Sequence, residues 1–272
     1  MKTFENVLIH GFVALLLATS IFPIAWLFMV STKSPLEVFA RPPVWIYKPI
    51  LDNYYEIFVA QRFDAYILNS IVISSCSTAL SVAIGSLGAY SFARFKFRGS
   101  RNIAAWILST RMFPPIAAAV PIFILWKQVG LFDTQLGLTI VYAASNLPYV
   151  VWMMRAFLLE IPRELEEAAM VDGCTRLGAL TRIVLPLARP GLTATSILCI
   201  ILSWNEFLFA LVLTSMSAKT ASVAITGYIT AYGVKWGEVG AAAIAVTIPV
   251  IIFGLLAQRH LVRGLTFGAV KG

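Results

Sequence analysis

Six long apolar stretches run along the chain, separated by segments that carry most of its charged residues. A helix needs about 20 residues to cross the hydrocarbon core of a bilayer. The predicted spans are residues 7–30, 65–92, 102–126, 136–159, 187–214 and 238–259. The pattern therefore predicts an all-α, polytopic membrane protein with six transmembrane helices and with both termini on one side.

Composition agrees with a membrane protein. Hydrophobic residues make up 59% of the 272 residues and charged residues only 12%, and the mean hydropathy is +0.84. Soluble domains carry about twice that share of charge. The net charge of +8 does not indicate nucleic acid, because the basic residues are scattered between apolar runs. Cys76, Cys174 and Cys199 form no CxxC pair, so neither a disulfide framework nor a metal site is indicated.

The first apolar stretch resembles a signal peptide, since Lys2 precedes it and residues 18–20 are small. The run continues to Val30, however, and is longer than the apolar core of a signal, which is roughly 7 to 15 residues. We therefore expect this stretch to be the first span of the protein.

Basic residues predict the orientation, because Lys and Arg accumulate on cytoplasmic loops. With both termini in the cytoplasm, thirteen basic residues lie inside, seven lie outside, and Arg111 lies within a span. The inner set is Lys2, Arg94, Lys96, Arg98, Arg101, Arg155, Arg163, Arg176, Arg182, Arg189, Arg259, Arg263 and Lys271. This orientation places the charged segment 160–186 in the cytoplasm and the segment 31–64 on the outer side.

Segment 160–186 carries the signals of two short helices. Pro162 suits the first position of a helix, and three glutamates follow it near the positive end of the helix dipole. Gly173 is typical of a residue that ends a helix in the left-handed conformation, and Thr175 can cap a second helix. Ala168 and Ala169 would allow close approach of another surface. From these residues alone, a docking hairpin and a solvated loop remain equally open.

The same segment carries a specific motif: Glu167-Ala168-Ala169, three residues, Gly173, nine residues, then Ile183-x-Leu185-Pro186. With this motif the chain resembles the transmembrane subunits of ABC importers. Further matches make it similar to carbohydrate-uptake permeases such as the smaller maltose permease subunit. They are Asn69-Ser70, Ala89-Tyr90, Ala93-Arg94-Phe95, Met112, Pro114, Gly130-Leu131, Asp133-Thr134, Pro148, Trp152, Trp204-Asn205-Glu206-Phe207 and Gly268-Ala269-Val270-Lys271-Gly272.

The resemblance implies the type I ABC importer permease fold, with residues 1–272 as one transmembrane domain in the bacterial inner membrane. It implies a second homologous permease, two cytoplasmic ATPase subunits and a periplasmic or lipid-anchored solute-binding protein as partners. It also makes 160–186 a coupling segment that docks on an ATPase, with Glu167 facing a basic ATPase residue. The other implied docking residues are Ala168, Ala169, Asp172, Gly173, Ile183, Leu185 and Pro186. Gly268, Lys271 and Gly272 resemble a tail that reaches the same interface.

The chain has no phosphate-binding loop of the form GxxxxGK[ST], which a nucleoside triphosphate site of this kind requires. We therefore expect no enzymatic activity and no cofactor in this chain. The resemblance implies that ATP and Mg are bound by the partner ATPase subunits. The transported solute is implied to be a sugar or a sugar-like molecule, and polyols and glycerol phosphate stay open as alternatives.

Polar residues within the spans are candidates for the solute pathway, because such groups are costly in lipid. The candidates are Asn205, Glu206, Asn146 and Arg111. Trp204 is a further candidate, because its ring can stack on a sugar, and the alternative for it is a lipid or core contact. The alternative for Asn146 and Asn205 is packing between helices. Arg111, followed by Pro114 and Pro115, can instead mark a broken helix.

Segment 31–64 is rich in proline and aromatic residues. It can dock a binding protein or form an interfacial aromatic belt. A secondary transporter and a membrane-embedded enzyme are the rival classes. The chain shows no internal repeat, no HExxH and no GxSxG motif, so both are disfavoured.

Overall fold

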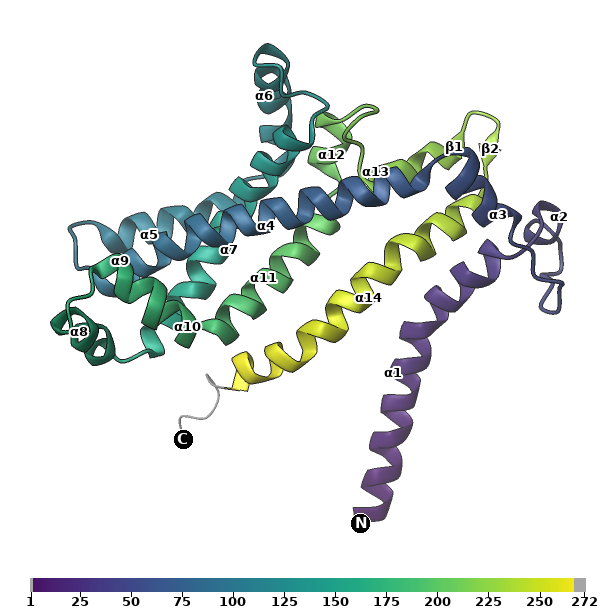
Figure 1. Cartoon of the computed structure of the whole chain (residues 1–272). Helices are drawn as coiled ribbons and strands as arrows, with labels where there is room; N and C mark the ends of the chain where they lie inside the picture. Colours follow the sequence, from purple (N-terminus) through teal and green to yellow (C-terminus); the bar gives the residue numbers. More distant parts are fainter. Residues whose placement is uncertain (1, 267–272) are drawn as a thin grey trace. The chain divides into compact units, whose positions relative to one another are not determined.

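The computed structural model describes residues 2–266, and most of this part is helical (Figure 1). Within it, four helices are long and apolar enough to cross a membrane. They are α1 (Lys2–Ser31), α4 (Phe63–Arg94), α7 (Gln135–Glu160) and α14 (Trp236–Thr266). These helices correspond to the predicted spans 7–30, 65–92, 136–159 and 238–259.

Two further spans are bent. Helix α5 (Ser100–Ser109) continues through the 3₁₀ turn η2 (Thr110–Met112) and then meets α6 (Pro115–Gln128) at an angle of 90°. Pro114 lies at the bend, in extended conformation, and a proline cannot continue the preceding helix. The predicted broken helix near Arg111 is therefore confirmed. If each bent pair of helices counts as one span, the described part of the chain holds up to six.

The predicted span 187–214 is divided differently from our expectation. Helix α11 (Arg189–Trp204) bends by 79° from the run formed by α9 (Arg176–Ala179), the π-helix η3 (Leu180–Val184) and α10 (Leu185–Leu187). A separate helix α12 (Leu208–Leu213) follows. Asn205 and Glu206 therefore lie at a break between helices rather than in the middle of one. Both side chains bond to backbone groups of the adjoining helices, which satisfies hydrogen bonds that the break leaves open.

Short elements complete the fold. They are α2 (Pro35–Val38), α3 (Asp52–Tyr55), the π-helix η1 (Glu56–Ala60), α8 (Arg163–Val171), α13 (Ala221–Ala224) and the 3₁₀ helix η4 (Ile225–Tyr228). The strands β1 (Ile229–Thr230) and β2 (Gly233–Val234) pair antiparallel and form the one small departure from an all-α chain in the described residues.

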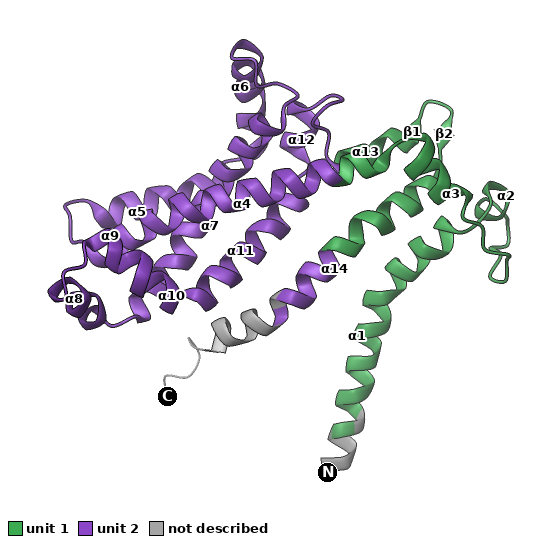
Figure 2. Cartoon of the chain, viewed as in Figure 1, with its two compact units in different colours: residues 1–67, 223–249 green, residues 68–222, 250–272 purple. Residues whose placement is uncertain are grey.

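The chain forms two compact units (Figure 2). Unit 1 comprises residues 1–67 and 223–249, and unit 2 comprises residues 68–222 and 250–272. Helices α4 and α14 each contribute to both units. A single transmembrane domain over 1–272 stays a prediction.

Unit 1 contains the predicted outer segment 31–64. Asn53 fixes its beginning, since Nδ2 donates to the carbonyl oxygens of Ser31 at 2.9 Å and Lys33 at 3.0 Å. Ser34 and Glu37 form a capping box that begins α2. Trp45 and Ile46 remain exposed. The segment is thus an ordered structure with apolar side chains on its surface.

Unit 2 holds the two candidate sites. Its main apolar core lies where α4, α7, η3 and α11 meet. Helices α8 and α9 gather at one end of this unit, and α6 and α12 lie at the other (Figure 1).

Candidate functional site

Three of the five predicted pathway residues line one pocket of about 180 Å³ in unit 2. Arg111 comes from η2, Asn146 from α7, and Glu206 from the break after α11. The remaining lining residues are Tyr142, Ser145, Leu202 and Ser203. Sequence reasoning missed Tyr142, Ser145 and Ser203, because neutral polar side chains in a span carry no distinctive signal.

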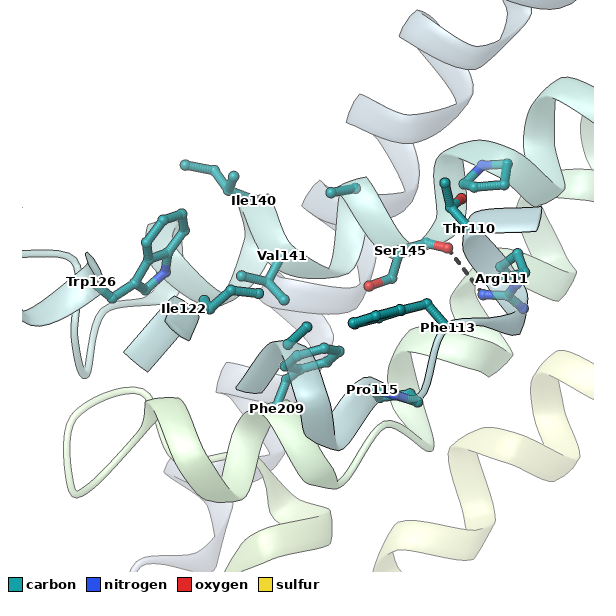
Figure 3. Close-up of a pocket in the computed structure, with 13 residues that line it drawn as sticks. Thr110, Arg111, Phe113, Pro115, Ile122, Trp126, Ile140, Val141, Ser145 and Phe209 are labelled. Atoms are coloured by element: carbon teal, nitrogen blue, oxygen red, sulfur yellow. Dashed lines mark hydrogen bonds between the residues drawn. The ribbon is translucent and has the colours of Figure 1, made fainter. Parts of the chain in front are cut away.

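A larger cavity of about 350 Å³ adjoins this pocket and shares Arg111 and Ser145 with it (Figure 3). Its walls are mainly apolar and include Phe113, Val141 and Phe209. Small-molecule sites typically have volumes of about 300–1,000 Å³ and apolar walls with a few polar groups. Together the two cavities have the size and lining of a site for a small solute.

The polar groups of the smaller pocket also bond to the protein. Asn146 Nδ2 donates to Ser203 Oγ at 2.8 Å, and Arg111 Nη1 donates to the carbonyl oxygen of Ser145 at 3.0 Å (Figure 3). The carboxylate of Glu206 accepts the backbone N–H groups of Phe209 at 3.0 Å and Ala210 at 3.2 Å. Glu206 therefore satisfies the first N–H groups of α12. Asn146 connects α7 to α11, which is the packing role left open by the sequence.

The other two pathway candidates do not line these cavities. The side chain of Trp204 is only 2% exposed and meets Phe253 edge to face, with the ring centroids 6.1 Å apart. Asn205 is exposed, and its Nδ2 donates to the carbonyl oxygen of Ile201 at 2.8 Å. The structure thus brings together Arg111, Asn146 and Glu206 and leaves Trp204 and Asn205 apart from them.

The segment 160–186 forms the predicted pair of short helices. Pro162 is the residue before α8 rather than its first residue, and α8 runs from Arg163 to Val171. Glu166 and Ala169 are buried, whereas Glu167 and Ala168 are exposed. Of the two alanines expected to allow close approach of another surface, only Ala168 is open, because Ala169 lies one turn from Glu166 on the buried face of α8.

Glu166 anchors α8 to the end of α4. Its Oε2 lies 2.8 Å from Arg94 Nε, and both side chains are only 6% exposed. The hydroxyl of Tyr90 donates to the other carboxylate oxygen of Glu166. Arg94 Nη2 also donates to the carbonyl oxygen of Ile161 at 3.0 Å. A buried charge of this kind is tolerated only when it is paired and hydrogen-bonded.

The end of α8 has the predicted glycine cap. Gly173 has φ of +91°, the Cys174 N–H bonds the carbonyl oxygen of Ala169, and the Gly173 N–H bonds that of Met170. These bonds define a Schellman motif. Thr175 Oγ1 then accepts the N–H of Gly178 at 3.1 Å and caps α9, as predicted. The tight turn fixes how α9 follows α8.

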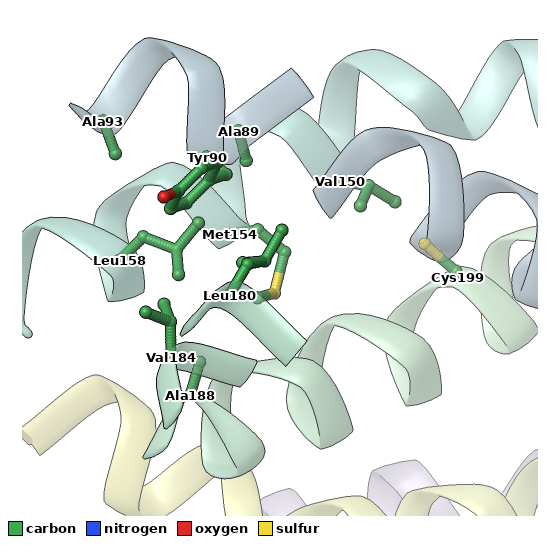
Figure 4. Packing of buried hydrophobic residues seen from close by; sticks show 10 residues of the cluster. All are labelled: Ala89, Tyr90, Ala93, Val150, Met154, Leu158, Leu180, Val184, Ala188 and Cys199. Carbon is green, nitrogen blue, oxygen red and sulfur yellow. The ribbon is translucent and has the colours of Figure 1, made fainter. Parts of the chain in front are cut away.

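The second helix packs into the core of unit 2. Leu180 and Val184 of η3 are buried against Ala89 of α4 and against Met154 and Leu158 of α7 (Figure 4). Ile183 and Leu185 are half-buried, and Pro186 is exposed. The whole coupling segment is therefore attached to the long helices α4 and α7.

One surface of the coupling segment remains open, and we call it the coupling face. It comprises Glu167, Ala168, Val171, Asp172, Gly173 and Leu177, all exposed. Val171 is 87% exposed and Leu177 is 63% exposed. Exposed large apolar side chains beside an anion are typical of a contact surface for another protein. The predicted tail residues Gly268, Lys271 and Gly272 lie outside the described residues.

Asp133 organises a different part of unit 2, near the start of α4. Its carboxylate accepts the backbone N–H groups of residues 215–218 at 2.8–3.1 Å. Burial acts to raise the pKa of Asp133, but these four N–H groups outweigh it and lower the pKa to about 2. Asn69 holds the same loop through the carbonyl oxygens of Ser217 and Lys219. Within residues 2–266 no group of three or more His, Cys, Asp or Glu side chains is placed to hold a metal ion.

Comparisons with known proteins identify this architecture. Residues 81–267 match the family described as binding-protein-dependent transport system inner membrane component. The trehalose transport system permease protein SugB of Mycobacterium tuberculosis is 38% identical over 261 residues, which cover 95% of each chain. The trehalose/maltose transport system permease protein MalG of Thermococcus litoralis is 38% identical and covers 93% of this chain and 92% of its own. A probable ABC transporter permease protein of Sinorhizobium fredii is 39% identical over 92% of this chain and 90% of its own.

A solved structure has the same fold. The crystal structure of a bacterial ABC transporter involved in the import of the acidic polysaccharide alginate contains a chain that matches with a TM-score of 0.79. That chain is 25% identical, and the match covers 95% of this chain and 96% of the other. The chain belongs to the family of binding-protein-dependent transport system inner membrane components. It is a multi-pass permease subunit of an ABC importer.

Proposed function

We propose that this permease imports a sugar or a sugar-like solute, which a solute-binding protein delivers from outside. Support comes from the curated relatives named for trehalose and for trehalose and maltose transport. The size of the pocket region around Arg111, Asn146 and Glu206 is compatible with such a solute. Glycerol phosphate and polyols are the competing solutes.

The solute can be tested on the binding protein encoded beside this chain. A ligand that binds only the native state raises the melting temperature, and the rise grows with the logarithm of the ligand concentration above its Kd. We expect trehalose, maltose or a related glycoside to raise it at micromolar to millimolar concentration. A rise with glycerol phosphate or a polyol, and none with any saccharide, would contradict sugar import.

The coupling face is proposed to dock on one of two cytoplasmic ATPase subunits, which bind ATP and Mg. The observation that carries this proposal is the division of α8 into two faces: Glu166 is buried against Arg94, whereas Glu167 and Ala168 are open. A helix that is anchored on one face and free on the other can move as a rigid body with a docked partner and displace the helix to which it is anchored. Ile183, Leu185 and Pro186 then position the return into α11.

Transport in this proposal is alternating access between this permease and a second, homologous one. ATP binding closes the ATPase pair, α8 moves with the ATPase, and α4 and α7 follow because the coupling segment packs on them. ATP can shift this equilibrium only by binding one conformation more tightly than the other. Docking through the coupling face therefore couples the free energy of ATP binding at the ATPase subunits to the conformation of the two permeases.

The substitution Glu167→Lys tests the docking. Reversing a charge at a protein contact costs several kcal/mol when a partner charge faces it, and each 1.4 kcal/mol is tenfold in affinity. We expect ATPase co-purification and solute uptake to fall by about tenfold or more. Glu160→Lys is the matched control, because Glu160 is also an exposed glutamate but is the last residue of α7 and lies outside the coupling face.

Equal effects of the two substitutions, or wild-type uptake and co-purification with Glu167→Lys, would contradict docking through the coupling face. The melting temperature of each purified variant must match that of the wild type. This requirement separates loss of docking from loss of folding.

The cytoplasmic position of both termini and of the coupling segment is part of this proposal. Single cysteines in place of Arg98 and Lys219, in a chain whose own cysteines are replaced, should react with an impermeant thiol reagent from opposite sides. Labelling of both from the same side of the membrane would refute the six-span topology.

The outer segment 31–64 is proposed to contact the binding protein, with an interfacial belt as the alternative. Its exposed apolar residues include Leu36, Trp45 and Ile46. A photo-crosslinker at Ile46 distinguishes the two, since the proposal expects a cross-link to the binding protein that depends on solute. A cross-link to lipid alone favours the belt.

A further inference from the structure

A separate cavity of about 360 Å³ lies in unit 2 and plays no part in the two sites described above. It is formed between the end of α4, the beginning of α5 and the second half of α7. The lining residues are Phe92, Ser100, Arg101, Ala104, Ala105, Trp152 and Arg155. Two of the seven are arginines and none is acidic.

Both arginines lack an acidic partner in the described part of the chain, where the ion pairs are those of Arg62, Arg94 and Lys235. Arg155 is half-buried, and Arg101 is exposed. Two guanidinium groups that line one cavity repel each other, and an anion between them would remove that repulsion. Guanidinium groups bind phosphate in a bidentate manner, which makes a phosphate the favoured anion.

The cavity lies near the helix ends that carry the coupling segment. Arg155 precedes the end of α7 by five residues, or about 7–8 Å along the helix. Arg101 is the second residue of α5. Trp152 lies one turn deeper than Arg155 on the same face of α7, and tryptophan is enriched at the headgroup level of a bilayer. The cavity is therefore at the depth of lipid headgroups.

An apolar surface continues from the cavity along α5 at Leu108, which lies one turn beyond the cavity-lining Ala104 and Ala105 and is 42% exposed. Ile103 and Trp106, 44% and 68% exposed, lie on the opposite side of this helix. A free phosphate would use only the arginines, whereas a phospholipid would use both the arginines and the apolar surface.

We propose that this cavity binds the phosphate of an anionic phospholipid from the cytoplasmic leaflet. Arg101 and Arg155 hold the phosphate oxygens, Ser100 donates its hydroxyl, and the acyl chains lie along α5. Basic pockets between transmembrane helices on the cytoplasmic side are suited to such headgroups. The proposal rests on the proposed cytoplasmic position of the coupling segment and is independent of which solute is carried.

The test uses the full permease complex, purified with its co-expressed subunits in a neutral detergent. Native mass spectrometry measures retention of phosphatidylglycerol against phosphatidylcholine with the same acyl chains. We expect Arg101→Gln/Arg155→Gln to lower phosphatidylglycerol retention by about tenfold and to leave phosphatidylcholine unchanged. The control Arg98→Gln/Arg182→Gln removes the same charge from exposed residues outside the cavity and should retain phosphatidylglycerol at the wild-type level.

Equal retention in the cavity variant and the wild type would overturn the proposal, and so would equal losses in the cavity and control variants. Thermal unfolding with inorganic phosphate tests the other source of the anion. Stabilisation by inorganic phosphate together with no arginine-dependent retention of phosphatidylglycerol would also overturn it. Arg155→Lys keeps the charge and loses the bidentate geometry, so it should give an intermediate retention of phosphatidylglycerol. This single conservative variant also keeps the proposal testable if the double variant does not fold.

Failure of the underlying topology would be recognised separately. Labelling of a cysteine at residue 98 from outside would overturn the cytoplasmic leaflet in this proposal, whatever the lipid retention. Loss of ATPase docking or a non-sugar solute would leave the predicted dependence on Arg101 and Arg155 unchanged.

Discussion

Two carboxylates, Glu166 and Asp133, fix distant parts of unit 2 near opposite ends of α4, but in different ways. At its C-terminal end, Arg94 forms a buried ion pair with Glu166 of the coupling segment. Towards its N-terminal end, Asn69 holds the loop 215–219, which also wraps around the carboxylate of Asp133. Arg94 and Asn69 are 25 residues apart in one helix, or about 38 Å.

The difference lies in what each carboxylate binds. Glu166 binds side chains of one helix, so α8 is tied to α4 at a point and can move with it as one body. Asp133 binds four successive backbone N–H groups, so it shapes a loop. The buried pair depends on both of its charged members, whereas the Asp133 contact is partly open to solvent and depends on a single charge. If the coupling face docks as proposed, this contrast suits the coupling end to transmit force and the opposite end to hold a fixed surface.

The largest effect is expected from Arg94→Ala. Removing one partner of a buried ion pair leaves an uncompensated charge and costs about 3–5 kcal/mol. Thermal unfolding of the purified complex should show this loss, accompanied by loss of uptake. Arg98→Ala is the matched control, because Arg98 is exposed in the loop that follows α4.

The double variant Arg94→Leu/Glu166→Leu sharpens this test. It removes both charges and should recover much of the stability lost in Arg94→Ala. If Arg94→Ala is as stable as Arg98→Ala, the buried pair does not anchor the coupling segment.

A smaller, pH-dependent effect is expected at Asp133. Its folded pKa of about 2 lies below the ordinary 3.8, so the stabilisation is fully present above pH 3.8 and is lost as the pH falls through about 2. Solvent screening limits it to about 1–2 kcal/mol. Asp133→Asn should lose that amount at pH 7 and should show a flatter decline of stability between pH 4 and 2. Parallel pH profiles for the variant and the wild type would show that the carboxylate does not hold the loop.

Gly173→Ala tests the turn within the coupling segment. A Cβ at Gly173 would meet nothing within 4 Å, so the cost is that of the left-handed backbone alone, about 1–2 kcal/mol. Gly173→Asn should cost less, because asparagine tolerates this conformation better. Equal melting temperatures for the two variants would mean that the turn relaxes to another conformation.

The smallest effect is expected at Asn146, which lies between the two ends of unit 2. Asn146→Leu removes the hydrogen bond to Ser203, and such bonds between transmembrane helices contribute about 0.6 kcal/mol on average. Uptake kinetics and unfolding should change little. A large rise in the KM for solute with unchanged stability would instead make Asn146 a solute contact.

The coupling segment could be predicted closely because its signals are local. The cap at Gly173, the cap at Thr175 and the exposed Glu167 follow from residues a few positions apart. The buried role of Glu166 could not be predicted, since its partner Arg94 is 72 residues away and the sequence shows three glutamates within four positions. The two charged side chains meet only because α8 packs on α4, and this packing could not be predicted from the sequence.

The pocket was predicted only in part for the same reason. Polar residues in apolar spans indicated Arg111, Asn146 and Glu206, but the same rule selected Asn205, and the stacking of aromatic rings on sugars suggested Trp204. Whether such a residue faces a cavity depends on where its helix ends and turns. The breaks before α6 and after Trp204 decide this.

The sequence by itself determined that the chain is an apolar, helical membrane protein with a charged segment of two short helices between its spans, because hydropathy and helix capping act over a few turns. Tertiary structure alone decided which glutamate is buried, where the predicted span 187–214 is divided and which polar residues share a cavity. Each of these depends on contacts between residues far apart in the chain, where burial determines whether a charge is paired or exposed.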